Sequence, residues 1–256
     1  MKKIILSTVA AMALTTSVYA EISLEIGAGI WKPSLSGDVN YKGSTINFDS
    51  LGVKDELEVS NNYLYADFKH FVPIIPNIMV QQLNYGISGN SSLNTNITFD
   101  NQTFNVGETV KTTIDMKQTD FIMYWGLPFI NTLSAGVFDI NYGLDAKNIS
   151  GSIQINEKSK SFDEVLPLLY LNAKISIPVI DTDIVGTIKT LSYDGAKISD
   201  NEIKASIKLP ISSLLVDVKV DAGYKVQNIT IPSSLVDNFD AKIDTDGFFF
   251  GLSAKF

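Results

Sequence analysis

The sequence contains no cysteine, no arginine and a single histidine, His70. A chain without cysteine cannot use disulfides, so an exported protein of this composition depends on backbone pairing or on a large core. One histidine leaves little scope for catalytic arrangements that combine histidine with serine or aspartate. With 20 basic and 28 acidic side chains the chain is net negative, which argues against nucleic-acid binding.

Long hydrophobic runs are also missing beyond the first residues. No later stretch reaches the roughly 18 apolar residues that a membrane-spanning helix needs, which excludes a helical inner-membrane protein. The first 20 residues instead resemble a signal peptide: Lys2 and Lys3 are positive, Ile4 to Leu14 is apolar, and Val18-Tyr19-Ala20 suits cleavage. We therefore expect a signal peptide at 1–20 and a single domain at 21–256.

What the mature chain does contain is period-two alternation of apolar and polar residues. In 248–256, for example, Phe248, Phe250 and Leu252 share one face and Gly251 and Ser253 share the other. The segments that alternate are 22–31, 62–73, 78–89, 111–127, 135–148, 164–177, 183–194, 201–210, 214–226 and 248–256. They predict an all-β, closed antiparallel transmembrane β-barrel of about ten strands, with eight as the alternative count.

The connections between these segments alternate in length. Four short turns open with proline, at Pro73, Pro128, Pro178 and Pro210, where a missing N–H donor is tolerated at the rim of a sheet. The other connections, 34–61, 90–110, 149–163 and 227–244, are longer and polar, and 195–200 is the exception. Short periplasmic turns and longer extracellular loops are typical of outer-membrane barrels. Within 93–106 we expect a hairpin that turns at Asp100-Asn101 and extends its two flanking strands.

Alternation alone does not say which face is outside, and a soluble exported β-protein stays open as an alternative. The polar face carries a nearly balanced set of acids and lysines, which suits a confined and mutually paired lumen. The predicted lumen charge network is Glu25, Asp67, Lys69, Asp120, Asp139, Asp145, Lys147, Lys174, Lys204, Lys208, Asp217, Lys219, Asp221, Lys225 and Lys255.

The last strand resembles the signal that the barrel-assembly machinery of the outer membrane reads. Gly251, Ala254 and Phe256 fit that pattern, whereas Phe249 stands where a polar residue is usual. The stretches 27–34 (GAGIWKPS), 72–77 (VPIIPN) and 191–195 (LSYDG) resemble an uncharacterised family of small bacterial outer-membrane proteins. The resemblance implies a barrel in the outer membrane of a Gram-negative bacterium, and it implies no activity.

Candidate chemistry is sparse. His70 precedes a predicted periplasmic turn, away from the outer rim where barrel proteases place their Asp pair and His-Asp pair, so we expect no catalytic residues and no enzyme activity. We expect no cofactor and no metal; the weak candidate for a metal site is the acidic segment with Asp237, Asp240, Asp244 and Asp246, which lacks the glutamate of a calcium loop. Aromatic residues near strand ends are expected to form membrane girdles: Trp31, Tyr63, Tyr65, Trp125, Phe129 and Phe248.

These features favour a structural or surface-interaction role, with outer-membrane lipid and lipopolysaccharide as surroundings and an extracellular partner that the sequence does not identify. A narrow channel or a carrier for a small solute is the alternative. A barrel of about ten strands is nearly filled by its own side chains, whereas porins with water-filled pores use 16 to 18 strands. Inner glycines at 27, 29, 143 and 223 leave local space for a conduit.

Overall fold

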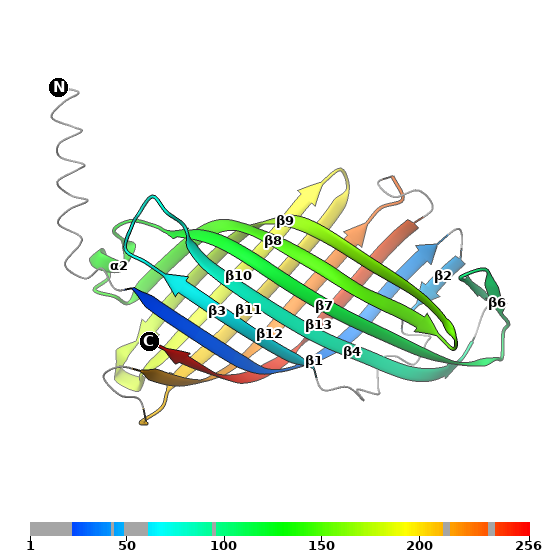
Figure 1. The fold of residues 1–256 in the computed structure, drawn as a ribbon, viewed down its shortest axis with the longest axis horizontal. Helices are drawn as coiled ribbons and strands as arrows, with labels where there is room; N and C mark the ends of the chain where they lie inside the picture. The colour runs from blue at the N-terminus through cyan, green and yellow to red at the C-terminus, as the bar shows by residue number, and fades with distance from the viewer. Residues whose placement is uncertain (1–21, 42–43, 49–60, 94–95, 212–215, 235–238) are drawn as a thin grey trace, which may run out of the picture.

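A computed structural model describes residues 22–41, 44–48, 61–93, 96–211, 216–234 and 239–256. The predicted signal peptide 1–20 and Asp237 lie outside these residues. Ten antiparallel strands form a closed barrel (Figure 1). They are β1 (Ser23–Tyr41), β3 (Asn62–Lys69), β4 (Asn77–Ser92), β7 (Thr109–Gly126), β8 (Phe138–Ile155), β9 (Lys158–Ile177), β10 (Thr182–Tyr193), β11 (Ala196–Lys208), β12 (Asp217–Ile231) and β13 (Phe239–Lys255).

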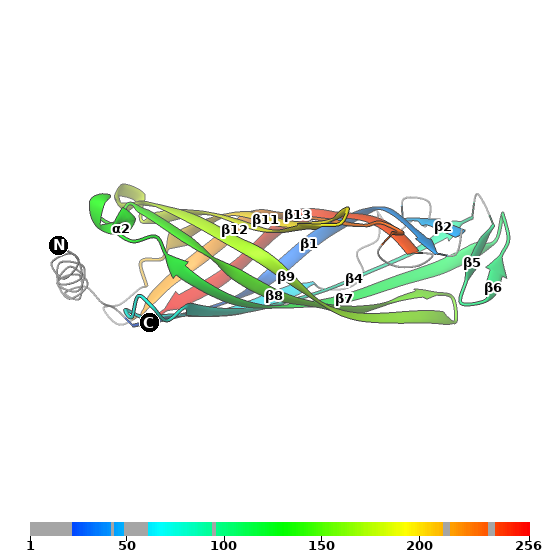
Figure 2. The same ribbon diagram turned by 90° about the horizontal axis from the view of Figure 1, so that it is seen from above.

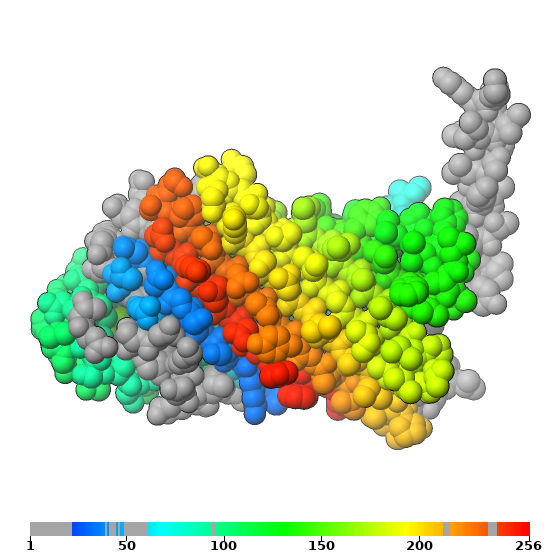
Figure 3. Space-filling model, turned by 180° about the vertical axis from the view of Figure 1, so that it is seen from behind, coloured from blue at the N-terminus to red at the C-terminus, as the bar shows by residue number. Residues whose placement is uncertain are grey.

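The barrel closes between its first and last strands. β1 pairs with β13 from Glu25↔Lys255 to Tyr41↔Phe239, and Figure 3 shows β1 in blue lying along β13 in red. Beyond the paired register, Leu24 and Phe256 exchange two backbone hydrogen bonds of 3.2 and 2.9 Å. The seam therefore leaves no free strand edge along the barrel wall, as a membrane-spanning sheet requires. No helix among the described residues is long and apolar enough to cross a membrane.

One end of the barrel carries the short connections, confirming the predicted turns at Pro73, Pro128 and Pro178, whereas the predicted turn at Pro210 lies partly outside the described residues. The β3–β4 turn contains Pro73, the β7–β8 turn contains α2 (Ile130–Leu133), and the β9–β10 turn contains the 3₁₀ helix η3 (Pro178–Ile180). Residue 22 and Phe256 lie at this end, which we call the turn end (Figure 1). The other end, which we call the outer end, carries the remaining connections.

At the outer end β1, β8, β9 and β13 run much further than the alternation indicated. The predicted loop 149–163 is wrong as a loop, because β8 and β9 continue as a paired hairpin to a two-residue turn at Asn156 and Glu157. The start of the predicted loop 34–61 is likewise strand, in β1 and β2 (Ser44–Asn47). Parts of 90–110 and 227–244 also belong to strands. The sheet thus rises well beyond the part of the chain that a bilayer can enclose.

The hairpin predicted within 93–106 is confirmed, with one difference. β5 (Ile97–Phe99) pairs with β6 (Gln102–Phe104), and Asp100 and Asn101 turn with positive φ of 46° and 62°. This hairpin forms its own two-stranded sheet at the outer end rather than continuing β4 and β7 (Figure 2). Lys160 on β9 holds it through an ion pair of 2.8 Å to Asp100, and that hydrogen bond lowers the pKa of the Asp100 carboxyl.

Strand β7, predicted nearly in full as 111–127, shows how the two faces change along one strand. At the turn end its outward residues are apolar, with Phe121 42% exposed, while its inward residues include the buried Asp120. Towards the outer end the outward residues are polar and the inward residues are apolar. Lys111 points outward, and Ile114 points inward and is 3% exposed. The period of two is unbroken, but the sign of the pattern reverses. We call the position of this reversal the polarity switch.

The same reversal recurs around the barrel. Outward side chains change from apolar to polar between Ile30 and Lys32 on β1, Val80 and Gln82 on β4, Phe121 and Thr119 on β7, Ala146 and Asn148 on β8, Ile203 and Asn201 on β11, and Phe248 and Asp246 on β13. On the turn side of the switch an apolar exterior is stable only in lipid, so this part spans the membrane. On the outer side the barrel is built like a soluble β-protein, with polar walls and an apolar interior.

Three girdle predictions are corrected by this arrangement. Trp31, Tyr63 and Tyr65 are buried inside the barrel, whereas Phe129 and Phe248 are exposed and Trp125 is partly exposed on the outer wall. Trp31 on β1 and Tyr63 and Tyr65 on β3 occupy positions whose side chains point into the lumen. A position near a strand end predicts a girdle residue only if the side chain also points outward.

The polarity switch makes a direct prediction. Val220→Lys places a charge on the lipid-facing wall of β12 and should lower the free energy of unfolding by about 2–4 kcal/mol. Thr113→Lys places the same charge on the outward face of β7 beyond the switch, beside Ser88 and Gln154, and should change stability by less than about 0.5 kcal/mol. Urea unfolding in lipid vesicles measures both. Equal losses in the two variants would contradict the assigned membrane boundary.

Candidate functional site in the barrel lumen

A layer of buried charges crosses the lumen near the polarity switch. We call it the ionic layer: Asp120 on β7, Asp145 and Lys147 on β8, Lys189 on β10, Asp200 on β11 and Lys225 on β12. Lys147 Nζ lies 2.7 Å from Asp120 and 2.9 Å from Asp200, and Lys225 Nζ lies 2.5 Å from Asp200. Lys189 pairs with Asp120 and lies 3.8 Å from Asp145. Removing such charges from water is costly unless each has a partner. The layer supplies close partners to Asp120 and Asp200, whereas both buried carboxylate oxygens of Asp145 lack a hydrogen bond to any described residue.

A pair of glutamines completes the crossing. Gln118 on β7 and Gln227 on β12 are joined by hydrogen bonds of 2.9 and 2.8 Å. In the barrel order β7 and β12 are five strands apart in either direction, so this contact spans the full diameter. Gln227 also donates to Asp200 at 3.0 Å, and Lys147 donates to Gln118 at 3.3 Å. The side chains of opposite walls therefore meet in the middle of the bore.

A second seal lies mainly on the outer side of the ionic layer. We call this apolar cluster the outer core; it comprises Trp31, Leu35, Phe48, Tyr63, Tyr65, Leu83, Tyr85, Ile87, Leu93, Ile97, Phe99, Phe104, Val110, Ile114, Met116, Ile149, Ile155, Ala241 and Phe249. Trp31 packs edge-on against Tyr85, with ring centroids 5.1 Å apart, and its indole N–H donates to the Gly247 carbonyl at 3.2 Å. A water-filled path would have to pass both the charged and the apolar layer.

The inner glycines do not leave open space. A Cβ at Gly27 would lie 2.3 Å from the ring of Tyr65 on the neighbouring strand, and a Cβ at Gly223 would lie 2.3 Å from the ring of Phe249. Each glycine instead accommodates an aromatic ring laid across it, an arrangement that protects the backbone of a curved sheet. The expected local space for a conduit at these two positions is therefore filled.

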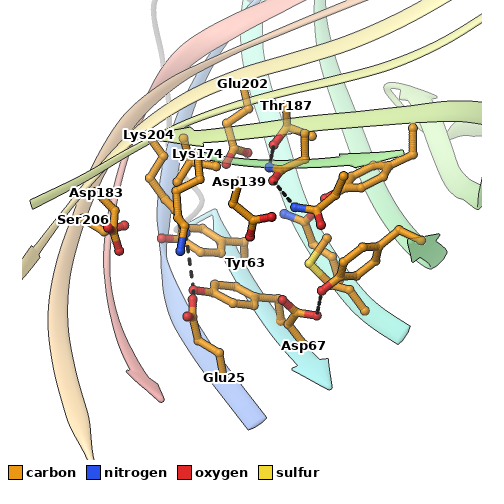
Figure 4. A pocket seen from close by; sticks show the side chains of 18 of the residues that line it. Glu25, Tyr63, Asp67, Asp139, Lys174, Asp183, Thr187, Glu202, Lys204 and Ser206 are labelled. Carbon is orange, nitrogen blue, oxygen red and sulfur yellow. Dashed lines mark hydrogen bonds between the residues drawn. The ribbon is translucent and has the colours of Figure 1, made fainter. Parts of the chain in front are cut away.

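Below the ionic layer the lumen widens into a cavity of about 360 Å³, which we call the vestibule. Its lining reaches side chains at the turn end, where Lys69 is 37% exposed, so the vestibule opens towards that end. Figure 4 shows Glu25 and Asp67 on one wall and Lys174, Thr187 and Lys204 on the facing wall.

Tyrosines hold the carboxylates of the first wall. Tyr65 donates to Glu25 at 2.7 Å and Tyr124 donates to Asp67 at 2.6 Å. Lys204 Nζ reaches Tyr65 at 3.4 Å, above the face of its ring. A carboxylate fixed by a phenol is an acceptor in a constant position. The vestibule thus presents fixed charges of both signs to whatever enters it.

The predicted network residues are distributed over these two levels. Glu25, Asp67, Lys69, Asp139, Lys174, Lys204, Asp217, Lys219 and Lys255 line the vestibule, and Asp120, Asp145, Lys147 and Lys225 belong to the ionic layer. Asp221 is fully buried, 3.9 Å from Lys204. Lys208 lies at the rim, 2.6 Å from Asp217, with both side chains well exposed.

Two central residues, Lys189 and Asp200, were missing from the predicted set. Asp200 fell in the expected turn 195–200, but β11 already begins at Ala196. Lys189 lies in a segment whose alternation fits either phase. Extending the pattern Asp200, Glu202, Lys204 backwards from the clear part of β11 would have found Asp200. Nothing local distinguishes the two phases around Lys189.

The acidic segment near the outer end does not gather into a site. Asp240, Asp244 and Asp246 lie on the outward face of β13, where Asp244 accepts from Asn228 at 2.7 Å and Asp246 accepts from Tyr224. Over the described ranges no group of three or more histidines or carboxylates is arranged to hold a metal ion.

The remaining residues singled out by sequence lie at the turn end. His70 contacts backbone atoms of the β3–β4 turn, with Nε2 3.0 Å from the Pro76 carbonyl and Nδ1 3.1 Å from the Val72 N–H. Gly251 and Ala254 belong to β13, and Phe256 follows it with an exposed ring.

The strand pairing and the two faces define a closed ten-stranded transmembrane β-barrel. No protein-family model matches the chain, and no curated protein matches it. Solved barrels of low similarity include the attachment invasion locus protein Ail of Yersinia pestis (8% identity, TM-score 0.37, covering 92% of this chain and 99% of that one). The outer membrane protease OmpT from Escherichia coli follows at 12% identity and a TM-score of 0.45, covering 92% and 96%. The Pseudomonas putida toluene transporter TodX matches at 8% identity and a TM-score of 0.24, covering 91% and 89%. Similarity at this level carries no functional information.

The ionic layer predicts a strong position dependence for lysine removal. Lys147→Met leaves Asp120 and Asp200 without their shared partner and should cost about 3–5 kcal/mol of stability. Lys208→Met breaks a solvent-exposed pair at the rim and should cost less than about 1 kcal/mol. Urea unfolding followed by tryptophan fluorescence compares the two variants. Similar small losses would show that the layer is hydrated rather than sealed.

Proposed function

We propose that this chain is a closed barrel of the outer membrane of a Gram-negative bacterium, exported with a signal peptide cleaved near Ala20. In this proposal it acts in surface interaction and neither conducts solutes nor catalyses a reaction. The observation that carries the proposal is the polarity switch with its sealed lumen. The strands leave the membrane and continue as a sheet with a polar outer face and an apolar interior. In this proposal that part of the barrel lies outside the cell, where it is available to bind partners.

The wall beyond the polarity switch suits the saccharide and phosphate groups of lipopolysaccharide. Its outward side chains include Lys32, Asp115, Lys117 and Lys242, all exposed, interspersed with serine and asparagine. Lysines can pair with phosphate, and amide and hydroxyl groups can bind sugars. We propose lipopolysaccharide as the immediate neighbour of this wall, and a partner at the tip formed by the outer core and the β5–β6 hairpin.

The absence of catalysis is supported by the position of the histidine. His70 is engaged with the turn backbone at the end of the barrel opposite to the extended wall. A His-Asp or His-Ser arrangement at the outer rim would need a second histidine, and the sequence has none.

A carrier or narrow channel is the second candidate, and the vestibule is the observation that favours it. Its volume of about 360 Å³ could admit a small polar solute from the turn end. The ionic layer and the outer core oppose its passage to the other side. We therefore rank solute binding from the turn end above conduction, and both below surface interaction.

Planar-bilayer recording separates closed and conducting barrels. The purified protein, shown to be folded by its heat-modifiable migration on a gel, should give no discrete conductance steps, because two layers of side chains fill the bore. A general porin measured in the same bilayers controls for insertion. Reproducible steps that change on neutralising Asp217 and Lys219 would overturn the closed barrel and favour the channel.

The C-terminal residue tests the proposed interaction with the assembly machinery. Deleting Phe256 removes the terminal aromatic side chain and two backbone hydrogen bonds to Leu24, so the amount of heat-modifiable protein in the outer-membrane fraction should fall severalfold. Phe256→Tyr keeps the aromatic ring and the backbone and should assemble normally. Normal assembly of the deletion variant would show that the resemblance to an assembly signal is misleading.

A further inference from the structure

The turn end of the barrel is covered with exposed apolar side chains. We call the following set the turn ring: Ile74, Phe129, Leu133, Val179, Ile180 and Ile211. Ile74 is 88% exposed, Leu133 83% and Val179 93%, and all four turns contribute. Residues 70–76, 127–137, 178–181 and 209–216 contain a single acidic residue, Asp181, and no lysine. Turns exposed to water are normally rich in polar residues and glycine. A large exposed apolar surface indicates a site that contacts a membrane or another protein.

The continuation of the lipid-facing wall onto the turns indicates which contact this is. On β8 the outward apolar run extends from Phe138 to Ala146. Nine residues at about 3.4 Å each, tilted by about 40°, rise roughly 23 Å, which nearly matches the apolar band about 25 Å tall of outer-membrane barrels. The polarity switch fixes the outer limit of the band. On the turn side the exposed side chains of Phe71, Leu127 and Ile177 continue this wall onto the turn ring.

Several backbone groups of the β3–β4 turn are hydrogen-bonded by side chains of the same end of the barrel, which suits a water-poor setting. His70 Nδ1 accepts from the Val72 N–H at 3.1 Å, which leaves Nε2–H to donate to the Pro76 carbonyl at 3.0 Å. The Trp125 indole N–H donates to the Ile74 carbonyl at 3.2 Å. Girdle tryptophans ordinarily point this group at water or headgroups. Here the group serves a turn carbonyl instead.

We propose that the turn ring is immersed in the acyl chains of the inner, phospholipid leaflet, with His70 and Trp125 satisfying the backbone of the β3–β4 turn there. The inference rests on the proposed location in the outer membrane, and it adds how deep the turns lie in that membrane. The barrel then has no projection on its inner side, and the vestibule opens at the level of the phospholipid headgroups. A periplasmic protein docked on the turn ring is the competing occupant.

Because the chain has no cysteine, single-cysteine variants can report depth directly. Ile74→Cys, Leu133→Cys and Val179→Cys, each spin-labelled in phosphatidylcholine vesicles, should collide more with oxygen than with a water-soluble nickel complex. Val220→Cys on the lipid-facing wall of β12 is the control for lipid, and Lys117→Cys on the wall beyond the polarity switch is the control for water.

The three turn labels should resemble the label at position 220 and differ from the label at position 117. Turn labels that collide freely with the nickel complex while position 220 does not would overturn the immersion and leave the turn ring for a protein partner. If position 220 is itself open to the nickel complex, the membrane barrel fails, and the inference fails with it. The two failures are thus distinguishable in one set of measurements.

Discussion

The structure depends on closing the sheet between β1 and β13. In hydrocarbon every unpaired N–H or C=O costs several kcal/mol, so a strand edge cannot face lipid. The seam meets this demand with close backbone approach. A Cβ at Gly29 would lie 2.2 Å from the Phe250 carbonyl oxygen, and one at Gly247 would lie 2.0 Å from the Lys32 carbonyl oxygen. Small residues at these two positions let the first and last strands reach each other along their whole length.

Closure also explains why the outward face changes from apolar to polar along the barrel while the inward face changes from polar to apolar. A strand cannot change its period of two without a bulge that would disturb the ladder, so the same register continues from lipid into water. When the surroundings of the wall change, the outward positions must change from apolar to polar. The inward positions then change in the opposite sense, because a wall in water needs an apolar interior. Asp120 and Phe121 lie next to each other on β7 on the membrane side of this exchange, and Ile114 and Asp115 lie beyond it.

Much of the fold could be predicted because barrel strands carry their signal locally. Alternation gave ten strands and an antiparallel closure, proline marked the four turns, and Asp100-Asn101 marked the hairpin. The outer halves of β1, β8, β9 and β13 were missed because the apolar side chains move from the outward to the inward face at the polarity switch, which interrupts the alternation in sequence. The lumen was only partly predictable for a different reason. Gln118 and Gln227 meet across the bore from strands 109 positions apart, and nothing in either neighbourhood specifies the other.

The ionic layer and the outer core make the two ends of the barrel different. Charged pairs such as Lys147 with Asp200 lie near the polarity switch and most of the apolar outer core lies beyond it. Over the described residues the vestibule therefore opens towards the turn end. In the proposed closed barrel a solute in the vestibule exchanges with the inner side, and a molecule outside the cell meets only the polar wall and the tip. The two ends then share no ligand through the bore. Any signal between them would have to pass through the packing of the strands, where the buried ion pairs and the outer core resist displacement. The chemistry of this barrel thus supports the proposed contact at its outer surface over transport through its interior.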